Sequence, residues 1–219
     1  MLFLAIQSLS HPGWNCTFYD YSYSNNVKSP NLSIQICIHP NYNYKESVED
    51  TVMEIWKLVD ADRNYTGVDY IRGCGDPIPN NMYYQVIEVW TIRKDGTVLL
   101  TQRHPDKFLG LKWESTGGAL NFDESQIEAA QRELHEETGI FQYKNNFIYL
   151  EDTLYSNYIV ISYVHIFDGQ LNDLELQSEE VVGAKFVGFD DIDDLKEEMP
   201  PRIVERFMKF KSIFKELIK

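Results

Sequence analysis

The chain has 219 residues, of which 43% are hydrophobic and 25% charged, a composition that excludes wholesale disorder. Acidic residues outnumber basic ones by 34 to 20, and a surface with a net charge of −14 repels a phosphate backbone. We therefore expect no nucleic-acid polymer as a partner. A small phosphorylated substrate stays compatible with this charge, because a bound cation reverses the local field.

The three cysteines, Cys16, Cys37 and Cys74, are widely spaced and form no Cys-x-x-Cys pair, so neither a zinc site nor a disulfide framework is predicted. This pattern favours a reducing compartment. No apolar run approaches the roughly 20 residues of a membrane helix. The opening stretch 1–9 lacks the basic region of a signal peptide. We expect a cytoplasmic protein with no membrane partner.

The composition changes near residue 46. Residues 1–45 carry only three charged side chains, are rich in Tyr, Asn and Ser, and contain one strand-like run at 32–38. The rest of the chain has the mixed polar and apolar pattern of a folded domain. We predict an N-terminal extension over 1–50, poorly structured or with added strands, and a working domain over 51–219.

Alternating apolar residues predict a series of strands in the second part. Asp95-Gly96, between two β-rich runs, is a strong hairpin signal. A second hairpin is expected around the turn residues 60–67. In chain order the predicted strands are 53–60, 68–72, 82–93, 97–103, 112–116, 146–151, 158–167 and 184–189.

Helices are predicted in the middle and at the end of this part. The first covers 123–138, with Asp123 as N-cap, Gln126 as its capping-box partner, and Gly139 just past its end. A short acidic helix is expected at 190–198. A basic amphipathic helix starts at Pro201. Strands combined with helices in this order predict a mixed α/β layer fold.

Three glutamates share one arc of the predicted helix. At about 100° per residue, Glu133, Glu136 and Glu137 fall together beside the apolar face. Like charges at i and i+4 cost a few tenths of a kcal/mol, so such a cluster needs a reason. Converging carboxylates suit a hard cation such as Mg²⁺ or Mn²⁺. The alternative interpretation is a solvated acidic helix face.

The stretch 118–140 reads GALNFDESQIEAAQRELHEETGI and resembles the Nudix box, G-x5-E-x7-R-E-U-x-E-E-x-G-U, where U is a bulky aliphatic residue. Every defined position matches. The resemblance extends over 53–219, and the segment before the core resembles the N-terminal hairpin of a bacterial subgroup related to isopentenyl-diphosphate isomerase-like Nudix proteins. It implies an α/β/α sandwich with a mixed β-sheet. The specified residues are Gly118, Glu124, Arg132, Glu133, Leu134, Glu136, Glu137, Gly139 and Ile140.

The resemblance also implies roles for these residues. Glu133, Glu136 and Glu137 are the expected ligands of Mg²⁺ or Mn²⁺, joined by the carbonyl group of Gly117. Glu124 would support the metal shell or pair with Arg132, and Gly118 and Gly139 would be structural residues of the box.

A further carboxylate is expected from a late loop. Glu180 is the first choice and Glu179 the second, the alternative for both being a solvated loop acid. The general base is Glu133, with Glu180 as the rival.

Substrate contacts are expected just outside the box. Arg103, at a strand end, would hold phosphate by a bidentate fork, unless it is an ordinary surface arginine. Trp113 and Glu114 would line the pocket, although Trp113 also suits a plain core position. His135 is at a variable position of the box and is expected to be solvated.

The function implied is hydrolysis of a diphosphate bond in a nucleoside diphosphate linked to another moiety, with water attacking one phosphorus in line. One alternative is an isopentenyl-diphosphate isomerase-like enzyme, but that enzyme needs a cysteine where Gly117 stands. Another is a non-catalytic Nudix-fold binding module, which usually lacks box carboxylates. The partner would be a small-molecule diphosphate, and the strand-rich edges are compatible with a homodimer.

Overall fold

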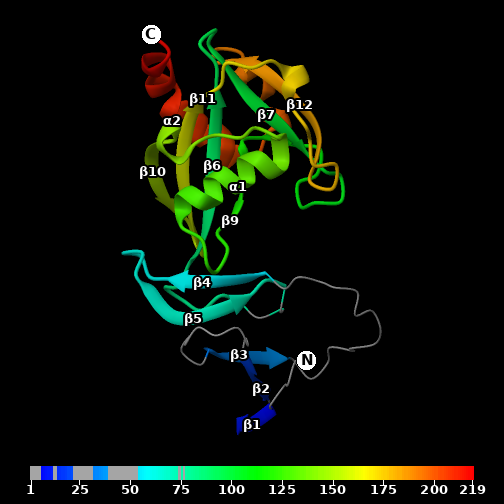
Figure 1. Cartoon of the computed structure of the whole chain (residues 1–219), viewed down its shortest axis with the longest axis vertical. Coiled ribbons are helices and arrows are strands. Elements are labelled where there is room, and N and C mark those ends of the chain that lie inside the picture. Colours follow the sequence, from blue (N-terminus) through cyan, green and yellow to red (C-terminus); the bar gives the residue numbers. More distant parts are fainter. Residues whose placement is uncertain (1–5, 12–13, 22–31, 39–53, 74, 76) are drawn as a thin grey trace.

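The computed structural model describes residues 6–11, 14–21, 32–38, 54–73, 75 and 77–219. In these ranges the strands form a seven-stranded sheet, a two-stranded hairpin and a three-stranded N-terminal sheet (Figure 1). The described helices and the large sheet all belong to the part of the chain after residue 80.

The large sheet is mixed. Its order is β10-β11-β6-β7-β12, with β9 added beside β6 and β8 beside β7. The β6 and β11 strands run parallel, whereas the other neighbours are antiparallel, so the predicted mixed α/β fold is confirmed. The strands are β6 (Tyr84–Ile92), β7 (Thr97–Arg103), β8 (Trp113–Glu114), β9 (Thr116–Ala119), β10 (Ile148–Leu154), β11 (Tyr158–Ile166) and β12 (Val181–Gly188).

The sheet divides between β6 and β7. These strands pair with each other at Ile92 and Val98, next to the tight turn at Gly96, whose φ of 83° suits glycine. Farther along, β6 takes β9 as its neighbour and β7 takes β8. Residues 113–119 are therefore inserted between the two central strands, which brings this segment to the middle of the fold.

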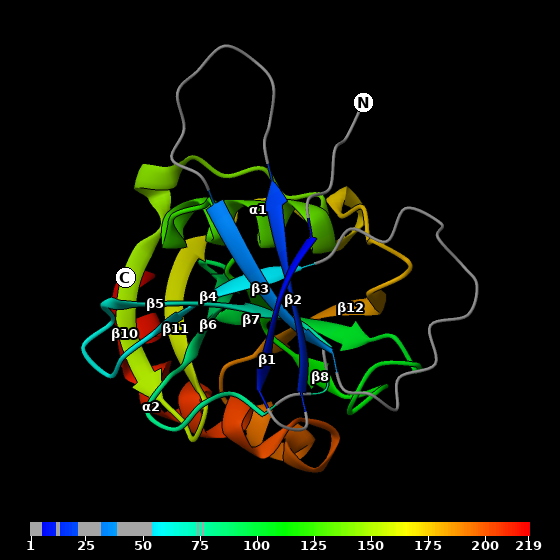
Figure 2. The same ribbon diagram turned by 90° about the horizontal axis from the view of Figure 1, so that it is seen from below.

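Two helices cover opposite faces of the sheet, α1 (Gln126–Thr138) and α2 (Pro201–Leu217) (Figure 2). Successive strand residues point to opposite faces, so Leu99 lies in the core under α1, whereas Val98 and Leu100 lie in the core under α2. On the α2 side, Phe207 and Phe214 pack against the buried ring of Trp90. The result is the expected α/β/α sandwich.

The start of α1 differs from the prediction. The N-cap is Ser125 and the capping-box partner is Glu128, whose carboxylate accepts the backbone N–H of Ser125 at 2.9 Å. The predicted cap at Asp123 is wrong, and so is Gln126 as its partner. The reason is the extended backbone of Ser125 (φ −81°, ψ 160°), which separates Asp123 from the helix. Gly139 ends the helix as predicted, with φ 73°.

The hairpin predicted around the turn residues 60–67 is confirmed as β4 (Ile55–Val59) and β5 (Tyr65–Ile71). It meets the large sheet through reciprocal backbone hydrogen bonds of 2.9 Å between Val59 and Tyr83, and Trp56 stacks on Tyr84 with ring centroids 4.4 Å apart. The 3₁₀ helices are η1 (Lys144–Asn146), η2 (Leu171–Asp173) and η3 (Ile192–Glu198). The predicted acidic helix at 190–198 is thus a 3₁₀ helix, and η1 shifts the start of β10 to residue 148.

The N-terminal sheet is antiparallel and has the order β1-β2-β3, with β1 (Ile6–His11), β2 (Trp14–Tyr21) and β3 (Leu32–Ile38). The predicted strand at 32–38 is therefore present. The proposed boundary near residue 50 lies outside the described residues and stays a prediction. No helix in the described ranges is both long and apolar enough to cross a lipid bilayer.

Candidate active site

Two of the acidic residues of α1 are buried against the sheet. Glu133 and Glu137, one turn apart, are 9% and 5% exposed, and Glu136 between them is exposed. Residues four apart share a helix face, so these two carboxylates follow Ala130 and Leu134 toward the sheet. Burial of a carboxylate is costly unless it is paired or used. The surroundings of the two buried carboxylates are therefore informative.

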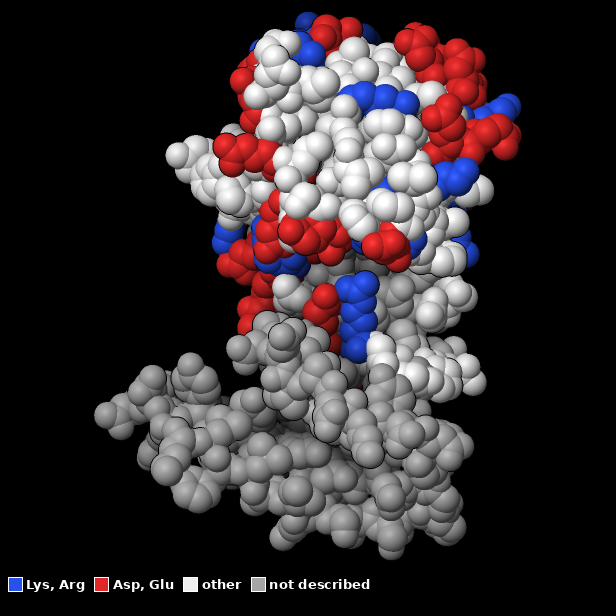
Figure 3. All heavy atoms as spheres, turned by 90° about the vertical axis from the view of Figure 1, so that its right-hand side faces the viewer, with Lys and Arg blue, Asp and Glu red and all other residues white. Residues whose placement is uncertain are grey.

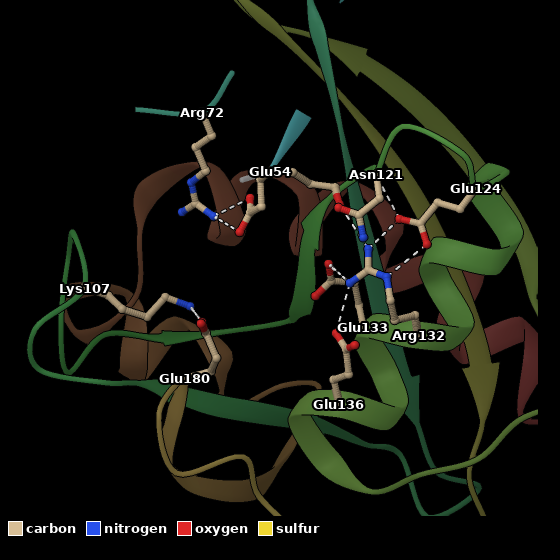
Figure 4. Close-up of polar contacts among 10 residues, drawn as sticks. Glu54, Arg72, Lys107, Asn121, Glu124, Arg132, Glu133, Glu136 and Glu180 are labelled. Carbon is tan, nitrogen blue, oxygen red and sulfur yellow. Dashed lines mark hydrogen bonds and ion pairs between the residues drawn. The ribbon is translucent and has the colours of Figure 1, made fainter. Parts of the chain in front are cut away.

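Arg132 gathers three carboxylates (Figure 4). Its guanidinium donates to Glu124 at 2.9 and 2.6 Å, to Glu133 Oε1 at 2.8 Å and to Glu136 Oε2 at 3.0 Å. It also donates to the carbonyl oxygen of Ala119 at 3.1 Å, which ties α1 to the end of β9. The box arginine thus fixes the orientation of its acidic neighbours.

Glu137 faces a different set of charges. Burial raises the pKa of Glu137 well above its usual value, and the negative charges of Glu114, Glu133 and Glu180 raise it further, whereas Lys107 opposes the shift. Within the described part of the chain its carboxylate accepts no hydrogen bond. A buried acid among like charges is the kind of group that marks functional sites.

Lys107 and Glu180 form an ion pair, and the charges of both residues act on Glu137 of α1. In Figure 4 this pair lies apart from the cluster around Arg132. The pair links the loop after β7 to the loop before β12, and the backbone N–H of His104 adds a 2.9 Å bond to the carbonyl of Glu180. The late-loop acid singled out from the sequence thus lies near Glu137, whereas Glu179 is exposed. Lys107 was missed, because a lysine in a loop has no spacing signal.

The residues predicted to contact the substrate lie on two different faces of the sheet. Burial raises the pKa of Glu114, although the adjacent Arg103 lowers it, and Glu114 joins the charges around Glu137. Arg103 donates to Glu114 and to the carbonyl of Phe108. Trp113 packs in the core on the α2 side, with the Lys185 ammonium 3.9 Å from its ring centroid. Adjacent strand residues point to opposite faces, which separates Trp113 from Glu114.

Two glycines bring the backbone of β9 close to these acids. A Cβ atom on Gly118 would lie 2.3 Å from Glu133 Oε1, and one on Gly117 would lie 2.1 Å from the carbonyl oxygen of Ile87. The Gly117 position has no room for a side chain because its neighbours are backbone atoms, whereas a side chain at Gly118 would displace the end of the Glu133 side chain. The β9 backbone therefore approaches both β6 and the Glu133 carboxylate, as a carbonyl ligand from this segment would require.

The donor atoms fit a hard divalent cation by their chemistry, since all are carboxylate or carbonyl oxygens. The orientations of the side chains do not yet form a binding site. Within the described ranges no three His, Cys, Asp or Glu side chains are arranged to hold an ion. Glu133 and Glu136 are turned to Arg132, whereas Glu137 makes no contact with this arginine among the described residues. Binding of a cation by all three would need Glu133 and Glu136 to exchange part of their contact with Arg132.

Further ion pairs border this region. Arg72 Nη1 donates to both carboxylate oxygens of Glu54, at 2.9 and 2.8 Å, and Figure 4 shows this pair together with the Arg132 cluster. Figure 3 shows acidic and basic side chains together in a band across the middle of one face of the molecule. His135 is exposed, as expected. Acidic side chains on this face are thus accompanied by basic ones.

Comparison with known proteins agrees with this geometry. The model of the NUDIX domain matches residues 82–208. An uncharacterized Nudix hydrolase from Listeria monocytogenes is 33% identical over 151 residues, covering 66% of this chain and 85% of the relative. One from Listeria innocua is 29% identical over 150 residues, with the same coverage. The CTP pyrophosphohydrolase of Escherichia coli is 47% identical over 49 residues, 22% of this chain and 36% of that protein.

Solved structures share the fold. The Deinococcus radiodurans protein DR0079 matches with a TM-score of 0.59 and 17% identity over 71% of this chain and 98% of its own. A bifunctional NMN adenylyltransferase/ADP ribose pyrophosphatase from Francisella tularensis, complexed with AMP and a Mn ion, matches with a TM-score of 0.52 and 18% identity. The match covers 64% of this chain and 43% of that chain. The NUDIX domain of Shewanella oneidensis NrtR, complexed with ADP ribose, matches with a TM-score of 0.50 and 16% identity. The match covers 59% of this chain and 87% of that chain. With its box carboxylates on α1 and a sandwich of this topology, the chain belongs to the Nudix family and is a Nudix hydrolase.

Proposed function

We propose that this hydrolase cleaves the diphosphate bond of a nucleoside diphosphate linked to another moiety, and that it does so with Mg²⁺ or Mn²⁺. The observation that carries the proposal is the state of Glu137. It is a buried carboxylate without a hydrogen bond from the described residues, surrounded by Glu114, Glu133 and Glu180. An arrangement that weakens the fold in this way is typical of a site kept for binding a cation.

Glu133, Glu136, Glu137 and the carbonyl of Gly117 would hold the metal, which supplies charge neutralisation for the diphosphate and a bound water of lowered pKa. Glu133 is the proposed general base. Its Oε1, which Arg132 now holds, would turn to the cation, and Oε2 would be left to accept a proton from the attacking water. Glu180 is the rival base, and Lys107 beside it offers a cation for a phosphate oxygen.

The proposed substrate class rests on coarser support. Proteins that share this fold are complexed with AMP or ADP ribose, and one relative of a short stretch is a CTP pyrophosphohydrolase. Nucleoside diphosphate derivatives are therefore the first compounds to test. The subgroup related to isopentenyl-diphosphate isomerase stays a prediction, as do the cytoplasmic location and the homodimer.

The test is a product screen over ADP-ribose, nucleoside diphosphate sugars, CTP and dinucleoside polyphosphates, each with Mg²⁺ and with Mn²⁺. We expect cleavage of at least one compound that stops when the metal is chelated. Hydrolysis in ¹⁸O-labelled water then identifies the phosphorus that is attacked, since the label enters that phosphate. Glu216→Gln, an exposed substitution on α2, is the control for protein quality.

Two outcomes would replace the proposal. Tight binding of these compounds without turnover would favour a non-catalytic module. Isomerisation of isopentenyl diphosphate would favour the isomerase alternative, although position 117 is glycine and no cysteine follows Cys74.

A further inference from the structure

A buried ion pair lies on the face of the sheet opposite α1. Glu88 of β6 is 3% exposed and Arg206 of α2 is 6% exposed. The Arg206 Nε donates to both carboxylate oxygens at 3.0 and 2.9 Å, and Nη2 donates to Oε1 at 2.8 Å. The two residues are 118 positions apart in the chain. The pair therefore locks the C-terminal helix to the central strand.

Three further side chains donate to the same carboxylate. They are Trp90 Nε1 at 2.9 Å, Ser115 Oγ at 2.9 Å and Ser162 Oγ at 2.8 Å. Both oxygens of Glu88 are thus fully occupied by donors. A buried charge pair gains little net stability over an apolar pair, but it imposes one geometry when every partner is satisfied.

Ser115 connects this network to the active site. It lies between Glu114, whose charge acts on Glu137, and the β9 strand that contains Gly117 and Gly118. Glu88 is also the β-sheet partner of Gly117. The strands on either side of Ser115 have two and four residues, and one of them contains both glycines, so they hold their own position weakly.

We propose that the Glu88–Arg206 pair positions the active site through Ser115, with Ser115 as the positioning residue. The Ser115 hydroxyl anchors residues 114–118 to a rigid buried carboxylate. Glu114 and the carbonyl of Gly117 then keep a fixed place against Glu137. The inference rests on the proposed metal-dependent hydrolysis, since it concerns the segment that would contribute to the cation site.

A matched control exists in the same network. Ser162 is also buried, at 0% exposed against 5% for Ser115, and donates to the same carboxylate, but it lies on β11, which contributes none of the charges that act on Glu137. A purely structural role of the network predicts equal effects of removing either hydroxyl. A positioning role predicts that only Ser115 affects the chemistry.

The experiment compares Ser115→Ala with Ser162→Ala in the full chain. We expect a similar fall in melting temperature for both. Ser115→Ala should lower kcat by about tenfold or more with little change in KM, and weaken Mn²⁺ binding by a comparable factor, as loss of an outer-shell partner does. Mn²⁺ affinity is measured without substrate, by the electron paramagnetic resonance signal of the free ion. Ser162→Ala should leave kcat and Mn²⁺ affinity within about twofold of the unmodified protein.

Each result decides the matter. If both variants change kcat and Mn²⁺ affinity equally, or neither does, the positioning role is overturned while the proposed hydrolysis stands. If the unmodified protein neither cleaves any diphosphate nor binds Mn²⁺, the proposed function fails first and the inference fails with it. Should Ser115→Ala not fold, the comparison uses Ser115→Cys and Ser162→Cys, in which the same weaker donor replaces each hydroxyl.

Discussion

A Cβ atom on Gly118 would lie 2.3 Å from Oε1 of Glu133, so the missing side chain at this position makes room for a carboxylate of α1. We expect Gly118→Ala to fold, since the group it meets is the end of a flexible side chain. The displaced Glu133 should cost about tenfold to a hundredfold in kcat/KM. Kinetics and thermal melting of the purified variant check both expectations.

Gly117→Ala is the informative comparison. Its Cβ would lie 2.1 Å from the backbone oxygen of Ile87, inside the sheet, where nothing can move cheaply. This variant should lose about 2–4 kcal/mol of unfolding free energy. Equal stability of the two variants would show that the β9 backbone does not approach as closely as described.

Glu137→Gln should abolish turnover and leave the fold intact. The amide removes a proposed metal ligand, and it also removes a buried charge that has no hydrogen bond from the described residues. In metal-free buffer we therefore expect unfolding free energy equal to or above that of the unmodified protein, measured by urea unfolding. Retained activity would remove Glu137 from the site.

Divalent cations should stabilise the unmodified protein by mass action. A ligand that binds the folded state alone adds about 2.7 kcal/mol at a hundred times its dissociation constant. We expect a rise in melting temperature with increasing Mn²⁺ or Mg²⁺, and no rise in Glu137→Gln. A flat curve for the unmodified protein with both metals would contradict the cation site.

His165 should make the protein less stable in mild acid. Burial lowers the pKa of His165 from 6.5 to about 4, and its ring contacts the Thr91 hydroxyl at 2.8 Å. As the pH falls below about 6.5 the unfolded chain takes up the proton first, so stability is lost progressively down to about pH 4. At about 1.4 kcal/mol per pKa unit, the loss amounts to about 3 kcal/mol.

Urea unfolding between pH 7 and 4.5 measures this loss. His165→Gln should show a shallower decline, because the amide does not titrate. His135→Gln, at an exposed position on α1, serves as the matched control and should follow the unmodified protein. Parallel curves for all three proteins would exclude His165 as the source.

Deletion of residues 1–45 should leave most of the activity. The described side chains of the candidate site all come from residue 54 onward. Steady-state kinetics of the shortened protein on the best substrate of the screen is the measurement. Complete loss of activity, with the melting temperature unchanged, would place part of the extension in the pocket.

Local pattern determined much of this protein. The spacing of the box from Gly118 to Ile140, the Asp95-Gly96 turn and the left-handed stop at Gly139 are all readable from neighbours a few residues apart. They predicted the α/β fold and the central helix, whereas the convergence of its glutamates on a cation stays a prediction. The helix start was predicted wrongly because two acceptable caps, Asp123 and Ser125, stand two positions apart, and only backbone conformation selects between them.

Contacts between distant parts of the chain were decided by the tertiary structure. Nothing local pairs Glu88 with Arg206, or Lys107 with Glu180, which are 118 and 73 residues apart. An acid in the middle of the apolar run VIEVW signals a buried partner but does not name it. Periodicity gives the face on which a side chain lies, whereas its partner depends on which strands become neighbours. Strand order is set by the burial of the whole sheet between two helices.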